Sequence, residues 1–110
     1  MGMDFYIGDE QIRIANYFHY NEFLNIVSQL GEFPQLLDHS PVHGEYLLEN
    51  TELSMYKGGV KELKKELEKL QAMKLPDFVA DIVTIMVEAC ELALKSNTKI
   101  TLDAGSYLGS

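Results

Sequence analysis

The segment Phe78–Leu94, FVADIVTIMVEACELAL, is the longest apolar-rich stretch of this 110-residue chain and decides the class of fold. Pro76 and Asp77 are typical of the first turn of a helix, where proline loses no hydrogen bond and an acid faces the positive end of the helix dipole. The apolar residues that follow cover more than half of the helix circumference: Phe78, Val79, Ile82, Val83, Ile85, Met86, Ala89, Cys90 and Ala93. We therefore expect the most buried helix of the core here. Acidic residues interrupt the segment, which argues against a membrane span.

The segments on either side of this helix add one more helix and one strand. Upstream, apolar residues recur three and four positions apart with lysine and glutamate between them: Val60, Leu63, Leu67 and Leu70. This spacing predicts a helix with one core-facing side. Gly58-Gly59 either breaks a helix that begins at Glu52 or lets another backbone approach closely. Downstream, Ser96-Asn97 ends the central helix, and residues 98–104, TKITLDA, predict a strand with Ile100 and Leu102 on one face.

The N-terminal part begins with an alternating pattern. Residues 4–15, DFYIGDEQIRIA, carry apolar side chains at every second position on both sides of Gly8-Asp9, which predicts a hairpin. A helix follows from Tyr17 to the stop at Gly31, with one further short turn at residues 33–37. We predict an α+β fold, in which a small β-sheet from both chain ends is covered by about three main helices. The length suits a single domain spanning residues 1–110.

The net charge of −8 is concentrated in the first half of the chain. Residues 1–56 carry nine acidic residues and one basic residue, Arg13, whereas the remainder is neutral. Such a surface does not provide the basic footprint that nucleic acids require, and it would be repelled by anionic membranes. It would attract a basic protein partner. The same charge is equally compatible with a role in solubility alone.

The single cysteine, Cys90, lies on the apolar helix and has no partner for a disulfide. A reducing compartment fits this composition, and the N-terminus lacks the basic and apolar regions of a signal peptide. We therefore expect a cytoplasmic protein in which Cys90 is buried and unreactive.

The histidines of the middle segment are the strongest hint of a metal site. His39 and His43, together with Asp38 or Glu45, are residue types that suit zinc. Pro41 prevents the two histidines from sharing one helical face, and a third firm ligand is missing. The other candidates for chemistry are weaker: no pattern selects a pair of carboxylates, and YKGGVK (56–61) lacks the spacing of a phosphate-binding loop. We predict no catalytic residue, no metal and no cofactor, hence no enzyme.

The order of motifs from GEFPQLL through HGEYL to GGVKELKKELEKL resembles a known family. It is similar to the small cytoplasmic immunity proteins of bacterial polymorphic toxin systems, in particular the immunity protein seventy group. The matching positions are Phe33, Pro34, Leu36, Gly44, Glu62, Leu63 and Leu70. The interval between Gly44 and Glu62 is longer than in that pattern, and Gly58-Gly59 is not part of it. The resemblance implies a non-catalytic protein that neutralises one cognate toxin, commonly by occluding its active site.

The segment between Asp38 and Glu52 is the predicted partner-binding surface. Its prolines and turn formers indicate an exposed position, and loops often carry recognition. The residues proposed to bind the partner are Asp38, His39, His43, Glu45, Tyr46, Glu49 and Glu52. The competing interpretation is that EYLLE is an ordinary strand, with Tyr46 and Leu48, or Leu47, packed inward. Two other functions remain open: a small acidic regulatory or scaffold protein, and a small enzyme or metal-binding domain built on His39–Glu45.

Overall fold

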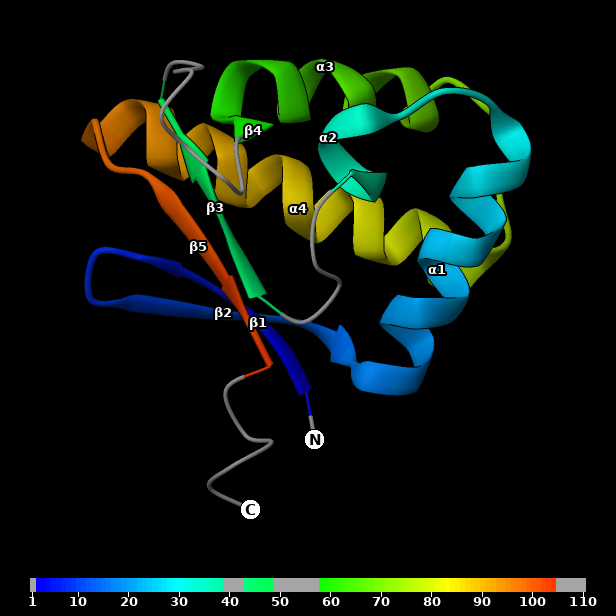
Figure 1. Ribbon diagram of the computed structural model, residues 1–110, viewed down its shortest axis with the longest axis horizontal. Helices are drawn as coiled ribbons and strands as arrows, with labels where there is room; N and C mark the ends of the chain where they lie inside the picture. Colours follow the sequence, from blue (N-terminus) through cyan, green and yellow to red (C-terminus); the bar gives the residue numbers. More distant parts are fainter. Residues whose placement is uncertain (1, 39–42, 49–57, 105–110) are drawn as a thin grey trace.

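The computed structural model describes residues 2–38, 43–48 and 58–104, and within them the chain forms a sheet and a layer of helices (Figure 1). The strands are β1 (Gly2–Ile7), β2 (Glu10–Asn16), β3 (His43–Leu47), β4 (Gly58–Gly59) and β5 (Ile100–Asp103). The helices are α1 (Tyr17–Leu30), α2 (Pro34–Leu37), α3 (Val60–Gln71) and α4 (Asp77–Ser96). The α+β prediction is confirmed, with three long helices and one short one in these ranges.

The N-terminal hairpin has the predicted turn. Gly8 has a φ of 62°, a value typical of glycine at the first position of a two-residue hairpin turn. From this turn the register places Ile7 opposite Glu10 and Phe5 opposite Ile12. A shift of register between Met3 and Asp4 marks a β-bulge, which locally increases the twist of the hairpin.

The sheet joins segments that lie far apart in the sequence, in the order β2-β1-β5-β3-β4. β5 lies between β1 and β3 and is antiparallel to both. The glycine pair forms β4, which runs parallel to β3 with Gly58 opposite Tyr46. Gly58-Gly59, for which the sequence left a helix break or a close backbone approach open, is thus a short strand. The helix expected to begin at Glu52 lies outside the described residues.

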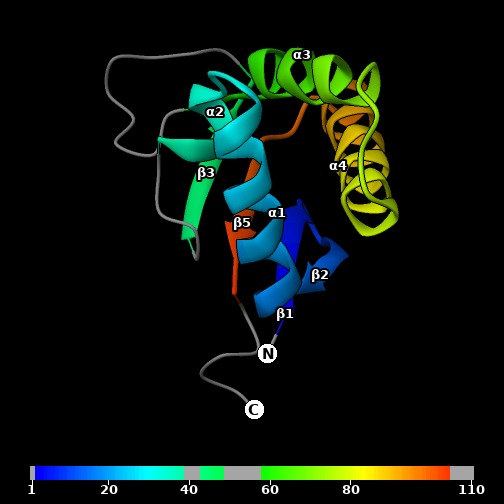
Figure 2. The ribbon, with the colours of Figure 1, turned by 90° about the vertical axis from the view of Figure 1, so that its right-hand side faces the viewer.

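The helices pack on one face of the sheet, and α4 lies behind it in Figure 1. Alternate strand residues point into this layer and are fully or almost fully buried: Met3, Phe5, Ile7, Tyr46, Ile100 and Leu102. The side view shows α3 and α4 on one side of the sheet and α1 crossing in front of it (Figure 2). The core thus forms between the inward face of the sheet and the apolar sides of α1, α3 and α4.

The central helix matches its sequence pattern closely. α4 begins directly after Pro76 and ends at Asn97, which adopts a left-handed conformation with φ of 56°. Cys90 is completely buried on this helix, as predicted, and burial raises the pKa of its thiol to about 12. Within the described part of the chain, none of the helices combines the length and the apolar character that crossing a bilayer requires.

Candidate partner-binding surface

Of the seven residues that the sequence grouped into one surface, the structure describes the side chains of Asp38, Glu45 and Tyr46. Asp38 is exposed at the end of α2, whereas Glu45 lies on β3. Of His43 the structure describes the backbone, which is paired with Asp103. The remaining predicted residues His39, Glu49 and Glu52 lie outside the described residues.

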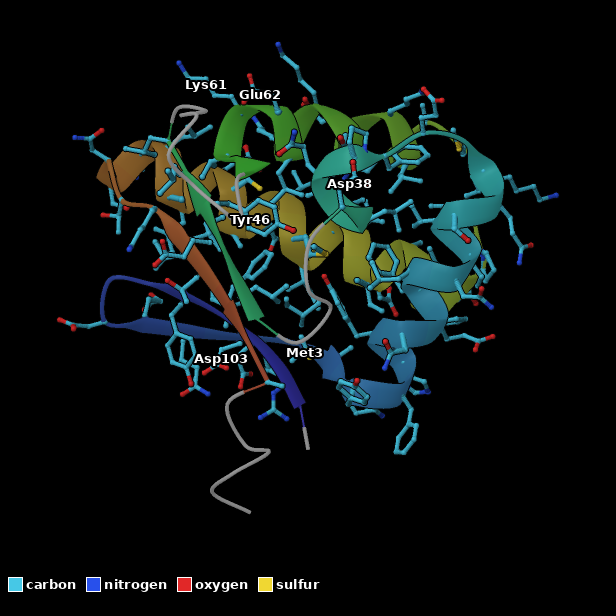
Figure 3. All side chains as sticks on the ribbon, viewed as in Figure 1. Met3, Asp38, Tyr46, Lys61, Glu62 and Asp103 are labelled. Carbon is cyan, nitrogen blue, oxygen red and sulfur yellow. The ribbon has the colours of Figure 1, made fainter. Side chains whose placement is uncertain are left out.

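Tyr46 is a correction to the predicted surface, because its side chain is fully buried. Strand alternation and the pairing of Tyr46 with Ile100 place both residues on the helix-facing side of the sheet. The Tyr46 hydroxyl donates a hydrogen bond of 2.9 Å to the carbonyl oxygen of Gln35, and the side chain extends from β3 towards α2 (Figure 3). Burial raises the pKa of the Tyr46 hydroxyl well above its ordinary value. Tyr46 therefore anchors the core and is not available as a surface contact.

Glu45 has a partner within the chain, since Lys99 Nζ lies 2.7 Å from its Oε1 atom. Both side chains are partly exposed, and Glu45 lies opposite Thr101 of β5 in the sheet register. The Lys99 ammonium compensates the negative charge of Glu45, so Glu45 contributes less to an acidic surface than its sequence position suggests.

Asp38 borders a hollow formed by α2 and the residues that flank it. The hollow has a volume of about 370 Å³ and is lined by Gly31, Glu32, Phe33, Pro34, Leu37 and Asp38. Phe33, Pro34 and Leu37 supply apolar surface, and the exposed residues Glu32 and Asp38 supply carboxylates. Figure 3 shows Asp38 on α2, away from Asp103 on the sheet. The region has an apolar lining with acidic residues beside it.

Gln35 fixes the orientation of α2, the short helix that carries one side of this hollow. Its backbone N–H donates to Glu66 Oε2 at 2.9 Å, and its carbonyl accepts the hydrogen bond from Tyr46. Its side-chain Oε1 accepts a 3.1 Å hydrogen bond from the N–H of Gly59. One residue of α2 is thus connected to α3, β3 and β4, which holds this short helix in place.

Glu66 completes this attachment with its second oxygen, which accepts the N–H of Leu36 at 3.2 Å. Burial raises the pKa of the Glu66 carboxyl, and the two backbone donors partly offset that increase. Nearby, Lys69 Nζ lies 5.2 Å from the centroid of the Phe33 ring, a cation–π contact between α3 and the lining of the hollow.

The one basic residue of the first half, Arg13, is already paired. Its Nε atom donates to Oδ1 of Asp4, the residue opposite it on β1. The Asp4 side chain is 1% exposed and the Arg13 side chain 55% exposed, while Asp4 Oδ2 is buried without a hydrogen-bond partner. A Cβ atom on Gly2 would lie 2.3 Å from the Arg13 guanidinium carbon, so the glycine makes room for Arg13.

The ion pairs of the described residues are therefore Asp4–Arg13 and Glu45–Lys99. The exposed acids of the first half that make no ion pair within these ranges are Asp9, Glu10, Glu22, Glu32 and Asp38. α1 and α2 contain no lysine or arginine. The helical corner, formed by α1, α2 and the residues between them, thus carries negative charge without an ion-pair partner among the described residues, as do Asp9 and Glu10 on the β1–β2 hairpin.

The metal hypothesis for His39 and His43 is not tested by the described side chains. Within residues 2–38, 43–48 and 58–104, no group of three or more histidine, cysteine, aspartate or glutamate side chains is placed to hold a metal ion. His39 lies outside these ranges, so the metal site at His39 and His43 stays a prediction from the sequence.

Sequence reasoning missed Glu32, Gln35, Glu66 and the Asp4–Arg13 pair. A signal existed for the last of these, because a two-residue turn at Gly8-Asp9 places Asp4 opposite Arg13 by counting along both strands. Gln35 and Glu66 lie 31 positions apart and share no local pattern. Their contact required knowledge of how α2 packs on α3.

Comparison with protein-family models found no matching family, and comparisons with curated proteins and with solved structures found no match. The resemblance to immunity proteins therefore stays a prediction from the sequence motifs.

Proposed function

We propose that this protein is a non-catalytic binding protein that engages a basic protein partner through the acidic surface of its first half. The specific form of the proposal is an immunity protein that neutralises a cognate toxin in the same cell by occluding the toxin's active site. The motif order of the sequence supports the immunity assignment. The distribution of charge in the folded chain supports the basic partner.

The observation that carries the proposal is the pairing of Arg13 with the buried Asp4. Because this pairing uses the one basic residue among residues 1–56, it leaves the exposed acids Glu22, Glu32 and Asp38 on the surface without an ion-pair partner among the described residues. Uncompensated surface charge of one sign speeds the association of an oppositely charged protein and disfavours acidic partners.

A second candidate is a small acidic regulatory or scaffold protein with another basic partner. The same charge distribution supports it, because charge complementarity does not depend on what the partner does. The two functions differ in the consequence of binding: an immunity protein abolishes a toxic activity, whereas a scaffold leaves its partner active.

The test is co-expression of this chain with the product of the adjacent gene in cells that this product harms. We expect restored growth and a complex that purifies intact. A complex without restored growth would favour the scaffold function, and absence of both would overturn the proposal for that partner.

The charge argument has its own matched variants. A variant with Glu22→Gln, Glu32→Gln and Asp38→Asn removes three unpaired charges, whereas Glu45→Gln removes a charge that Lys99 already compensates. We expect the triple variant to associate more slowly at low salt and the difference to shrink at high salt, because salt screens exposed charges. Equal slowing per charge in Glu45→Gln would contradict the role given to the unpaired acids.

A further inference from the structure

The hollow formed by α2 and the residues that flank it combines two properties that suit one kind of side chain. Its volume of about 370 Å³ lies at the small end of the range for ligand sites, roughly 300–1,000 Å³. Phe33, Pro34 and Leu37 give it an apolar lining, and Glu32 and Asp38 add two carboxylates. A side chain with an apolar stem and a cationic head matches both properties, because such chains bury the stem and keep the charge near polar groups.

The charges around the hollow favour a cation from outside the chain. Glu32 and Asp38 make no ion pair with another described residue, and no basic residue lies on α1 or α2. Lys69 contacts the lining through the Phe33 ring, with its Nζ atom 5.2 Å from the ring centroid. The Lys69 ammonium is thus placed over the aromatic ring, and no salt bridge joins it to either carboxylate.

The lining is also held in position before any ligand arrives. Gln35 lies within α2 and is hydrogen-bonded to Glu66, Tyr46 and Gly59. The N–H of Asp38 bonds to the carbonyl of Pro34 at 2.9 Å, which fixes the end of α2. Binding to a fixed site costs less ordering than binding to a loop, so even a single side chain can be recognised there.

We propose that this hollow is the recognition site for one arginine side chain of the basic partner. A guanidinium presents several N–H donors in one plane and is more weakly hydrated than an ammonium, so it suits a partly apolar site with two carboxylates better than lysine does. The identity of the partner rests on the proposed function. The preference of the hollow for a guanidinium does not rest on the proposed function, and it can be tested with a small probe.

The test is an NMR titration of the isotope-labelled full chain with N-acetyl-arginine methylamide. We expect saturable shifts confined to the amides of the hollow, including Glu32 and Asp38. N-acetyl-citrulline methylamide has nearly the same shape without the charge and should give no saturable shift. The lysine analogue should bind roughly fivefold more weakly, because its ammonium is a compact, strongly hydrated point charge.

Substitution of each carboxylate tests whether it contributes to binding of the arginine probe. Glu32→Gln and Asp38→Asn should each weaken binding of the arginine probe roughly tenfold, the scale of one lost charge-assisted contact. Glu88→Gln makes the same change of charge at an exposed position of α4 outside the hollow and should leave binding within about twofold of the original chain. Both hollow positions are exposed, and amide spectra of the free variants will report whether the fold is kept.

Several outcomes would overturn the proposal: no saturable shift, equal binding of citrulline or lysine, or equal weakening by Glu88→Gln. If arginine binds as expected and the adjacent gene product does not, the proposed function fails while the site stands. If that product binds and the hollow variants leave its affinity unchanged, the function stands and the site fails.

Discussion

Two carboxylates in this fold are held in opposite ways. Asp4 is buried on β1 and is held by a cationic side chain, that of Arg13 on the neighbouring strand. Glu66 is half-buried on α3 and is held by two backbone N–H groups at 2.9 and 3.2 Å. The first arrangement pairs the one basic side chain of residues 1–56 with a buried carboxylate, whereas the second attaches a short helix to a long one.

The difference determines what each carboxylate contributes to the protein. Because Arg13 compensates a buried charge, it leaves the acids of the helical corner unbalanced. Because Glu66 accepts backbone hydrogen bonds, it fixes α2 and therefore the position of Asp38. Asp4 thus affects the charge of the proposed binding surface, and Glu66 affects its geometry.

Replacing Arg13 should have the largest effect. Arg13→Ala leaves the Asp4 carboxylate buried with both oxygens without a donor, and an uncompensated buried charge is strongly destabilising. We expect a loss of about 2–3 kcal/mol in the free energy of unfolding, somewhat below fully buried pairs because Arg13 is half-exposed. Urea unfolding measures this loss. The double variant with Asp4→Ala should recover most of it; a double variant as unstable as Arg13→Ala would show that the charge of Asp4 is not the cause.

Removing the carboxylate of Glu66 should have the next largest effect. Glu66→Ala leaves the N–H of Gln35 without its acceptor, while the N–H of Leu36 keeps a 3.1 Å contact with the carbonyl of Phe33. We expect a loss of about 1–2 kcal/mol in the free energy of unfolding, the scale of unsatisfied partly buried donors. Hydrogen exchange provides the local readout, because the amide of Gln35 should lose protection while amides in the middle of α4 keep theirs. Unchanged exchange at Gln35 would mean that Glu66 does not hold α2.

The pH dependence of stability gives a smaller effect whose sign is the test. Burial raises the pKa of Glu66 above its ordinary value of 4.5, so the folded state binds this proton more tightly than the unfolded chain does. The resulting stabilisation is complete below pH 4.5 and is lost as the pH rises through the folded-state pKa. We expect the stability of the original chain relative to Glu66→Gln to fall as the pH rises above 4.5. A rise would indicate that the two backbone donors outweigh the cost of burial.

The exposed pair on the sheet should matter least. Lys99→Ala breaks the contact with Glu45, whose side chain is 38% exposed and can be solvated by water. We expect a loss of about 0.5 kcal/mol or less in the free energy of unfolding, because exposed ion pairs contribute little to stability. Thermal or urea unfolding measures this loss. A loss as large as that of Arg13→Ala would remove the contrast between buried and exposed pairs on this sheet.

The three long helices and the strands β1, β2 and β5 were predictable because their apolar side chains repeat with the period of the element. Leu63, Leu67 and Leu70 all face the core, as their spacing indicates. β5 follows the same logic, with Ile100 and Leu102 buried. Such a pattern lies within one segment of the sequence, so it predicts the element and its buried side without knowledge of what packs against it.

The direction of Tyr46 was not predictable from its own strand. The pattern EYLLE permits either face to be the buried one, and the choice depends on the register with β5, where Tyr46 lies opposite Ile100. The same holds for Lys99, whose partner Glu45 is 54 positions away. Long-range pairings of this kind decide which charges remain free, and for that reason the proposed partner-binding surface includes Glu22 and Glu32, which the sequence did not select.

The position of β5 also has a consequence for how the protein is made. β5 is C-terminal to the other strands and yet lies at the centre of the sheet, between the β1–β2 hairpin and the β3–β4 pair. During synthesis from the N-terminus, the two halves of the sheet cannot join until this segment has left the ribosome. Until then β1 and β3 each have an unpaired edge where β5 will lie, and such edges are prone to pair with other chains. A nascent chain that stalls before Ile100 is therefore expected to depend on chaperones.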